Sequence, residues 1–371
     1  IIIIFQMPIG FYSGGLLGLQ KQVLLNVINA CMNTLRDVGA VLILWLVSPT
    51  IQAFFLWQLV ITATTAFLLA FFLWRRLPVA EDRAVFQIRL VQGIWKFSAG
   101  MSGIAILGTI LSQLDKVIVS KILSLEMFGY YMLASVVAMS LVRVFTPVFL
   151  SIYPRLTQLV SLDDQEGISE LYHKSCQLVA VLILPVAIVI SFFSYEVILL
   201  WTQSEITAER THLILSILVW GTALNGLIHP PYALQLAFGW TQLSVLKNVI
   251  AVILLAPLTI YTTARYGAAG AASLWLLLNV GYVVFEIPIM HRRLLRNEMW
   301  RWYGQDVGAP LIAGLLFAGL GRYFFHGSGS SFVTLLYVMV ISLCTLGITV
   351  VSVPTMRSRL YDRFLKTKLE F

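Results

Sequence analysis

The chain has 371 residues, of which 59% are hydrophobic and only 11% are charged, and its mean hydropathy is +0.88. An ordinary soluble domain is about 45–50% apolar and about 25% charged, so this composition argues against a soluble enzyme and predicts a membrane protein. The formal net charge is +8. In a membrane protein such a basic excess is explained by topology, without nucleic-acid binding.

Several apolar runs are each long enough to cross a bilayer as a helix, which takes about 20 residues. They lie at roughly 1–20, 24–47, 51–74, 94–117, 127–151, 175–200, 211–236, 241–264, 268–290, 308–325 and 332–353. The strands of a membrane barrel would alternate apolar and polar residues over about 10 positions, whereas these runs are apolar throughout. The sequence therefore predicts an all-α integral membrane protein with about 11 transmembrane helices.

The basic residues indicate which helix ends face the cytoplasm. Most of the 25 Lys and Arg residues fall in every second loop, and the intervening loops hold only Lys116, Lys121, Arg210 and Arg265. Because basic loops are retained in the cytoplasm, we expect them and the C-terminus on that side, with Lys247 in one of these loops. This topology puts Ile1 on the outer side, so we expect an odd number of spans before it.

Two short segments resemble each other. Gly18–Ile28 reads GLQKQVLLNVI and Gly239–Ile250 reads GWTQLSVLKNVI, and a tyrosine precedes each, Tyr12 or Tyr232. The copies are six predicted spans apart, so they share one orientation in the membrane. This spacing predicts a parallel repeat of two six-helix lobes related by an axis along the membrane normal.

One stretch, Leu111–Leu159, resembles a known family. It contains the pattern SQLDKVIVSKILSLEMFGYY, the small-residue helix ASVVAMSL and the segment PVFLSIYPRLTQL, and a further match near the start reads YSGGLLGLQKQVLLNVI. In these segments the chain resembles the polysaccharide (O-antigen-type) flippases of the multidrug/oligosaccharidyl-lipid/polysaccharide exporter superfamily. The resemblance implies a two-lobed transporter with a central cavity and fourteen spans, so three spans would precede this chain.

The resemblance divides the chain into three parts. Residues 1–93 are expected to form the last three spans of the N-terminal lobe and a cytoplasmic connecting loop. Residues 94–290 are expected to form the C-terminal six-helix lobe. Residues 291–371 are expected to form two additional helices and a basic cytoplasmic tail.

Charged residues inside apolar runs are the candidate functional residues, because a charge at membrane depth is costly unless it faces protein, water or a ligand. Arg143 lies about 16 residues into its run, on the order of 24 Å along a helix. Its guanidinium fork suits the pyrophosphate of a lipid-linked sugar, and we assign it to substrate binding. The alternative is that Arg143 snorkels to the interface or forms a structural salt bridge.

Two further pairs of adjacent charges are candidates. Neighbouring residues on a helix point about 100° apart, so we expect Arg36 or Asp37 to pair with another helix. We assign Arg36 to substrate binding and Asp37 to ion coupling, with an interhelical ion pair as the alternative. Asp115 and Lys116 are assigned to substrate binding because the resembled family places their helix beside the cavity; interface anchoring is the alternative.

Two other residues lie near breaks or ends of runs. Glu286 is assigned to ion coupling, with a plain interfacial position as the alternative. His229 precedes Pro230 and Pro231, and this diproline predicts a break or hinge in its helix.

The signatures of enzymes are missing from the sequence. There is no phosphate-binding glycine loop, HExxH, GxSxG or paired-cysteine motif, and Cys31, Cys176 and Cys344 have unrelated spacings. We therefore expect a transporter without catalytic residues, metal or cofactor.

Three functions remain open. The first is flipping of polyprenyl-pyrophosphate-linked oligosaccharide repeat units across the cytoplasmic (inner) membrane, for O-antigen (lipopolysaccharide), capsule or exopolysaccharide synthesis. The second is cation-coupled export of drugs or other small molecules, which predicts a more acidic or aromatic cavity. The third is a membrane glycan polymerase or ligase, which generally needs a larger outer loop than the connections of about ten residues here. The arginines inside predicted spans favour the first.

The favoured function, flipping of a lipid-linked oligosaccharide, also indicates the expected partners. They are the lipid-linked oligosaccharide, membrane lipids and, as candidates, other membrane proteins of polysaccharide assembly. No nucleic-acid partner is expected.

Overall fold

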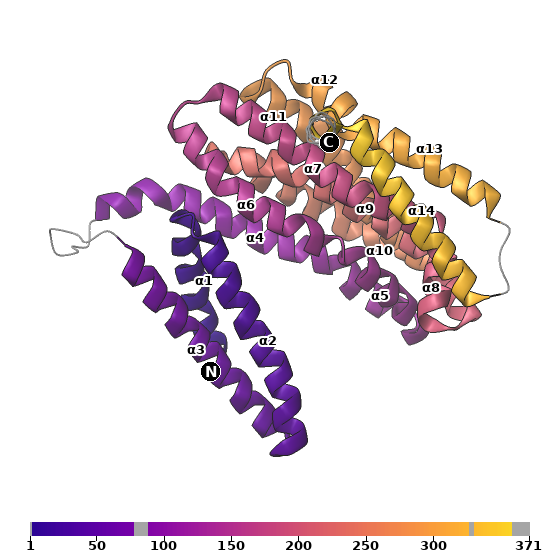
Figure 1. Ribbon diagram of the computed structural model, residues 1–371, viewed down its shortest axis with the longest axis horizontal. Coiled ribbons are helices and arrows are strands. Elements are labelled where there is room, and N and C mark those ends of the chain that lie inside the picture. Colours follow the sequence, from indigo (N-terminus) through magenta and orange to yellow (C-terminus); the bar gives the residue numbers. More distant parts are fainter. Residues whose placement is uncertain (1, 78–87, 326–329, 358–371) are drawn as a thin grey trace, which may run out of the picture. The chain divides into compact units, whose positions relative to one another are not determined.

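The computed structural model describes residues 2–77, 88–325 and 330–357, and these residues form helices joined by short turns, with no strand among them (Figure 1). The elements are α1 (Ile2–Gly18), α2 (Gln22–Leu46), α3 (Ile51–Arg76), α4 (Ile88–Ile122), α5 (Leu125–Met139), α6 (Val142–Ser161), α7 (Gln165–Phe192), α8 (Ser194–Thr202), α9 (Glu205–Ala237), α10 (Gln242–Gly281), η1 (Tyr282–Glu286), α11 (Ile287–Leu294), α12 (Met299–Arg301), η2 (Trp302–Gly308), α13 (Ala309–Phe324) and α14 (Ser331–Ser352). The predicted all-α membrane fold is confirmed.

Nine helical segments of the described chain are long and apolar enough to cross a membrane. The count of about 11 predicted from the sequence differs for two reasons. The helix α1 has 17 residues and falls just short of the length counted as a span. In addition, the longest segment, Gln242–Leu294, is counted once although Gly267 divides it into two helical arms.

That long segment is an antiparallel hairpin of two arms. Gly267 interrupts α10 with φ 64° and ψ −148°, a conformation that only glycine adopts without strain. The chain reverses so tightly there that a Cβ on Gly270 would lie 2.3 Å from the carbonyl oxygen of Thr262. The Tyr282 hydroxyl of the second arm donates to Asn248 of the first arm at 3.0 Å. The two predicted runs 241–264 and 268–290 are therefore the two arms of one hairpin.

The chain divides into two compact units, Ile1–Ile88 and Arg89–Phe371. The predicted three-part division into residues 1–93, 94–290 and 291–371 stays a prediction. Most of the predicted loop after Arg76, and the basic tail from residue 358 onward, lie outside the described residues.

The first unit is a three-helix layer in which α3 packs against both α1 and α2. Two glycines permit the close approach: a Cβ on Gly15 would lie 2.8 Å from the Leu73 side chain, and one on Gly39 would lie 2.3 Å from the Trp57 ring. Small residues of this kind let membrane helices approach closely. The Trp57 indole N–H donates to the backbone carbonyl of Arg36 at 3.0 Å, which satisfies a polar group inside the packed helices.

The second unit is built around α9, which packs against α5, α6, α7, α8 and α10. Helices that are apolar on all sides belong in the interior of a bundle, and α7 and α9 supply many of its fully buried residues. The last two long helices, α13 and α14, lie side by side and pack on α7 (Figure 1).

In the two similar segments, Gly18–Ile28 and Gly239–Ile250, the preceding helix ends in the same kind of cap. Before α2, the N–H of Lys21 bonds the carbonyl of Leu16, and Gln20 has φ 55°. Before α10, the N–H of Trp240 bonds the carbonyl of Gln235, and Gly239 has φ 67°. Both are Schellman caps, in which a left-handed residue lets the chain turn back over the last helical carbonyls.

A buried polar network ties the segment before α13 to α7. His173 of α7 bonds a carboxylate oxygen of Asp306 through Nδ1 and one of Glu298 through Nε2. Gln177 donates to the second oxygen of Asp306 at 2.8 Å, and Ser169 donates to Glu298 at 2.8 Å. Every carboxylate oxygen in this network therefore has a donor, as buried charges require.

Glu298 is the member of this network that lies between spans. Its partial burial opposes ionisation, but hydrogen bonds from Ser169 and His173 and the nearby charge of Arg301 outweigh that effect and lower the pKa of Glu298. A carboxyl group whose pKa is lowered on folding stabilises the fold at neutral pH, and this contribution disappears as the pH falls through the lowered pKa.

We predict that Asp306→Ala lowers the free energy of unfolding by about 3–5 kcal/mol, because it leaves a buried histidine without its carboxylate. Glu170→Ala is the matched control, since Glu170 forms an exposed pair with Lys174 one turn away, and such a pair contributes about 0.3–0.5 kcal/mol. Unfolding of the purified variants in mixed micelles measures the difference. Equal losses for the two variants would contradict this account.

Candidate functional site

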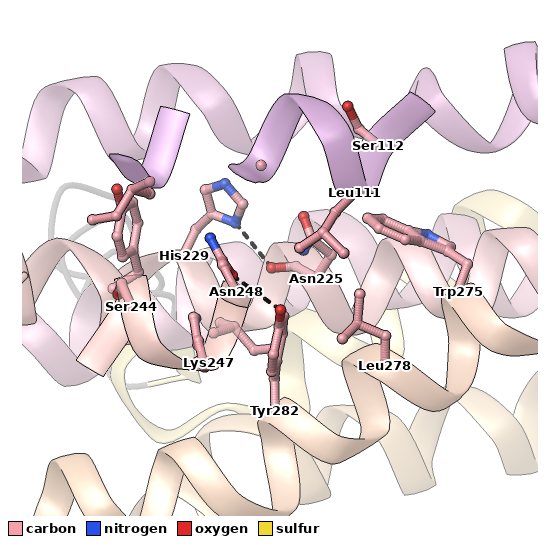
Figure 2. A pocket seen from close by; sticks show the side chains of 14 residues that line it. Leu111, Ser112, Asn225, His229, Ser244, Lys247, Asn248, Trp275, Leu278 and Tyr282 are labelled. Carbon is pink, nitrogen blue, oxygen red and sulfur yellow. Dashed lines mark hydrogen bonds between the residues drawn. The ribbon is translucent and has the colours of Figure 1, made fainter. Parts of the chain in front are cut away.

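A polar cavity of about 260 Å³ lies inside the second unit, between α4, α9 and the two arms of the α10 hairpin (Figure 2). Its walls combine aromatic rings, amide side chains and one lysine with aliphatic residues. They are Ile104, Gly108, Leu111, Ser112, Asn225, Ile228, His229, Tyr232, Ser244, Lys247, Asn248, Trp275, Leu278 and Tyr282. Among membrane-spanning helices such a concentration of polar groups is costly unless it serves a ligand or water.

The wall formed by α9 follows from helical spacing. Asn225, His229 and Tyr232 are four and three residues apart, which puts them on one face of the helix. His229 donates from Nδ1 to the Asn225 carbonyl at 2.9 Å, and a neutral ring bonded in this way keeps Nε2 as an acceptor. The helix continues through Pro230 and Pro231, so the break predicted at the diproline is not observed.

The buried pair of Lys247 and Glu286 joins the two arms of the hairpin. The Lys247 ammonium lies 2.5 Å from a Glu286 carboxylate oxygen, and the side chains are 17% and 2% exposed. Gln235 donates to the other Glu286 oxygen at 2.8 Å and accepts from Ser244 at 3.3 Å. These additional hydrogen bonds offset the desolvation that a buried ion pair suffers.

The Lys247 ammonium also lies over an aromatic ring. It is 4.4 Å from the centre of the Tyr282 ring and 5.9 Å from that of Tyr232. Both distances fall within the range of about 6 Å in which a cation is attracted to the face of a ring. One positive charge is therefore held at the edge of the cavity by a carboxylate and by aromatic faces.

A π-helical turn, η1, forms the wall opposite Lys247. The N–H of Ile287 bonds the carbonyl of Tyr282, five residues earlier, which leaves the Val283 carbonyl without a backbone donor because Pro288 has no N–H. The Tyr303 hydroxyl fills this role and donates to Val283 at 2.6 Å. The proline thus accounts for the irregular turn, and Tyr303 stabilises it.

Several cavity groups keep hydrogen-bonding capacity. Asn225 donates to Asn279 at 2.9 Å, and Asn248 accepts from Tyr282. Within the described residues, the Asn248 amide N–H₂, His229 Nε2 and the Tyr232 hydroxyl have no protein partner. The cavity therefore offers both donors and acceptors to a ligand rich in hydroxyl groups.

Of the residues assigned from the sequence, Asp115 and Glu286 lie nearest this cavity. Asp115 accepts a hydrogen bond from Tyr131, and its other oxygen is buried without a partner in the described part of the chain. Asp115 also lines a small hollow that shares Leu111 and Trp275 with the cavity. Lys116 instead turns back onto its own helix and donates to the Ser112 carbonyl at 3.2 Å.

Arg143 and the pair Arg36–Asp37 do not line the cavity. Arg143 is exposed at the start of α6 and has no side-chain partner among the described residues. Arg36 and Asp37 are exposed and bond each other at 3.0 Å, so the expectation that one of them pairs with another helix is wrong. The reason is that the long arginine side chain folds back to its neighbour. The substrate-binding and coupling roles of these residues stay predictions.

Sequence reasoning missed the residue that defines the site. Lys247 was expected in a cytoplasmic loop, but it lies within the first arm of α10 and is mostly buried. Lys247 and Glu286 are nearly equidistant along the chain from Gly267, and this symmetry about a glycine was the available signal.

Comparison with known proteins gives a family and a fold. Residues 22–205 match the model of a family described as "Polysaccharide biosynthesis protein". A solved structure titled "Lipid II flippase MurJ, inward closed conformation" is similar over 98% of this chain and 73% of its own, with a TM-score of 0.61 and 13% sequence identity. At that identity the likeness establishes a shared fold only. None of the curated proteins matches the chain.

We predict that Lys247→Met lowers the free energy of unfolding by about 3 kcal/mol or more, because it leaves the Glu286 carboxylate buried and unpaired. The double variant Lys247→Met/Glu286→Gln should recover most of this loss, since no unpaired charge remains. A double-mutant cycle on unfolding midpoints separates the two effects. Additive losses in the double variant would show that the pair is not coupled.

Proposed function

We propose that this chain, which resembles the polysaccharide flippases of the multidrug/oligosaccharidyl-lipid/polysaccharide exporter superfamily, flips polyprenyl-pyrophosphate-linked oligosaccharide repeat units across the cytoplasmic membrane. The repeat units would supply a surface polysaccharide such as O-antigen, capsule or exopolysaccharide. The protein would lie in the inner membrane with its basic helix ends and C-terminus in the cytoplasm, as the distribution of Lys and Arg favours.

The observation that carries this proposal is the polar cavity among apolar helices. Sugars present hydroxyl groups that donate and accept, and Asn225, Asn248 and His229 offer matching partners. The rings of Tyr232 and Trp275 provide apolar faces in the same cavity. A few well-placed polar groups beside aromatic and aliphatic walls are typical of a ligand site.

Lys247 supplies the positive charge that a pyrophosphate requires. An ammonium group has three donors, and Glu286 occupies one of them, so Lys247 can bind a phosphate oxygen as well. A phosphate arriving at Lys247 would weaken its hold on Glu286, and the Glu286 carboxylate would then be available to a coupling cation. This exchange supports the assignment of Glu286 to ion coupling.

The remaining assignments belong to the same proposal. Arg143, Arg36, Lys116 and Asp115 are proposed to contact substrate along its path, and Asp37 to take part in coupling. Arg143 is exposed and has no partner among the described residues. Its guanidinium group is therefore available to bind an anionic ligand.

The second candidate function, export of small organic cations, is favoured by the aromatic rings of Tyr232, Tyr282 and Trp275 beside Glu286. Against it, Lys247 neutralises Glu286 and occupies the face of Tyr282. Resistance of cells to cationic dyes, lost on deletion while surface polysaccharide stays normal, would favour this alternative.

Cells lacking the protein are expected to accumulate lipid-linked repeat units in the inner leaflet and to lose surface polysaccharide. Lys247→Gln/Glu286→Gln should fail to restore export, because it removes the cation without leaving a buried unpaired charge. The matched control is Glu170→Gln/Lys174→Gln, which neutralises an exposed pair and should restore export fully. Normal surface polysaccharide in the deletion strain, with no redundant flippase present, would refute the proposed function.

Arg143 is tested separately. Arg143→Ala should reduce export about tenfold or more, and Arg143→Lys should restore only part of it, because a lysine binds phosphate as a point charge without the bidentate fork. Export is measured as surface polysaccharide at matched protein levels. Unchanged export in both variants would remove Arg143 from the mechanism.

A further inference from the structure

The helix α2 of the first unit has three different faces. Its buried face packs into the core of the unit through Leu25, Ile28 and Met32. A second face is exposed and apolar, with Val27 and Val38 55% and 54% exposed, and this face suits contact with lipid. The third face lies between the other two and is polar.

The polar face carries four amide side chains at helical spacing. Successive members are four, three and four residues apart, which keeps them on one side of the helix. They are Gln22, Asn26, Asn29 and Asn33. We call these four residues the amide stripe. The polar face continues through Arg36 and Asp37, which bond each other.

This polar face extends through much of the membrane. The helix α2, Gln22–Leu46, is long and apolar enough to span a bilayer. From Gln22 to Asp37 the face is about 22 Å long at a rise of 1.5 Å per residue, compared with roughly 30 Å for the hydrocarbon core. The amides therefore lie at successive depths along one line.

The amides of the stripe have unused hydrogen-bonding capacity. None of the four side chains has a hydrogen-bond partner among the described residues. On the neighbouring helix α3, by contrast, Thr62 and Thr65 donate to carbonyls of their own helix one turn back. Because an amide without a partner is costly in hydrocarbon, the stripe faces protein, water or a ligand instead of lipid.

A hydroxyl-rich ligand fits this face better than another helix does. The backbone groups of a membrane helix are bonded within that helix, so a covering helix would need a polar side chain opposite each amide over several turns. An oligosaccharide presents hydroxyl groups along its whole length. These groups donate and accept hydrogen bonds, as amide side chains also do.

The two similar segments of the chain point to the same chemistry. Asn26 and Asn248 occupy equivalent positions in them, each followed by Val-Ile. Asn248 lines the polar cavity, and its amide N–H₂ has no protein partner among the described residues. Asn26 is exposed and likewise unpartnered in the described part of the chain. An asparagine with free donors therefore recurs at this position.

We propose that the amide stripe binds the oligosaccharide part of the lipid-linked substrate while it crosses the membrane. This inference rests on the proposed function and adds a sugar-binding surface on the first unit to the polar cavity of the second. Because the amides lie at successive depths, the hydroxyl groups of a moving glycan exchange one amide for the next.

Cysteine labelling tests whether water and sugar reach the stripe. Asn33→Cys/Cys31→Ala/Cys344→Ala is compared with Cys344→Ala alone, in which the exposed Cys31 lies two residues away on the opposite side of α2. A charged methanethiosulfonate reagent, which needs a thiolate, should label the cysteine at position 33 about tenfold faster than Cys31.

The same labelling is repeated with two added lipids. Undecaprenyl diphosphate that carries the repeat unit, extracted from the source cells, should protect the cysteine at position 33, whereas undecaprenyl diphosphate without sugar should not. No labelling at position 33 would show that protein or lipid covers the stripe and would overturn the proposal. Labelling without protection by the glycan would overturn it as well.

A binding measurement gives the contribution of the stripe. Asn26→Leu/Asn29→Leu/Asn33→Leu should weaken binding of the sugar-carrying lipid about tenfold and leave binding of the bare lipid unchanged. The matched control is Gln52→Leu, which removes an exposed amide of α3 outside the stripe and should change neither. Equal weakening for both lipids would indicate a structural role and would refute a sugar site.

These outcomes are separable from those that test the proposed function. If the unaltered protein binds neither lipid, the proposed function and the amide stripe both fail. If it binds the sugar-carrying lipid more tightly than the bare one, and the triple variant keeps that difference, the proposed function stands and only the amide stripe is wrong.

Discussion

A charge can remain among membrane-spanning helices only where protein groups replace the water that it loses, and in this chain Lys247 and Glu286 meet that requirement together. Their ion pair fixes the register of the two arms of the hairpin, because each arm supplies one partner. Gln235 donates to the second carboxylate oxygen, and Ser244 in turn donates to the Gln235 side chain. The polar cavity lies beside this pair, because Lys247 is one of the residues that line it.

The polar groups around His173 are buried under the same constraint, but they differ from those around Lys247 in how fully they are hydrogen-bonded. There, every oxygen of the two carboxylates has a histidine, glutamine or serine side chain as its hydrogen-bond partner, so Asp306 and Glu298 are already engaged by protein groups. Around Lys247, by contrast, the amide of Asn248 and the ring nitrogen of His229 have capacity to spare among the described residues. A polar group whose hydrogen bonds are all made by protein holds helices together, whereas a group with unused hydrogen-bonding capacity is available to a ligand.

The sequence predicted the helical architecture well, because long apolar runs have few alternatives in a bilayer. It also marked Glu286 and Asp115 as charges worth following. It did not place Lys247 correctly, because the sequence pattern around a lysine near the end of an apolar run is the same whether the side chain faces the cytoplasm or is buried against a neighbouring helix. The folding back of Arg36 onto Asp37 was missed because helical geometry fixes Cβ directions and leaves a long side chain free. The diproline of α9 does not interrupt the helix, and the hinge predicted there stays a prediction.

The hydrogen bond from Tyr303 to Val283 has a pharmacological consequence. Tyr303 lies in η2, directly before α13, and its hydroxyl stabilises the irregular turn that carries Tyr282 and Glu286. A compound that captured this phenol would leave the Val283 carbonyl without its donor and would disturb the turn that positions Tyr282 and Glu286 against Lys247. An inhibitor acting there would bind outside the polar cavity, since Tyr303 is not among the residues that line it.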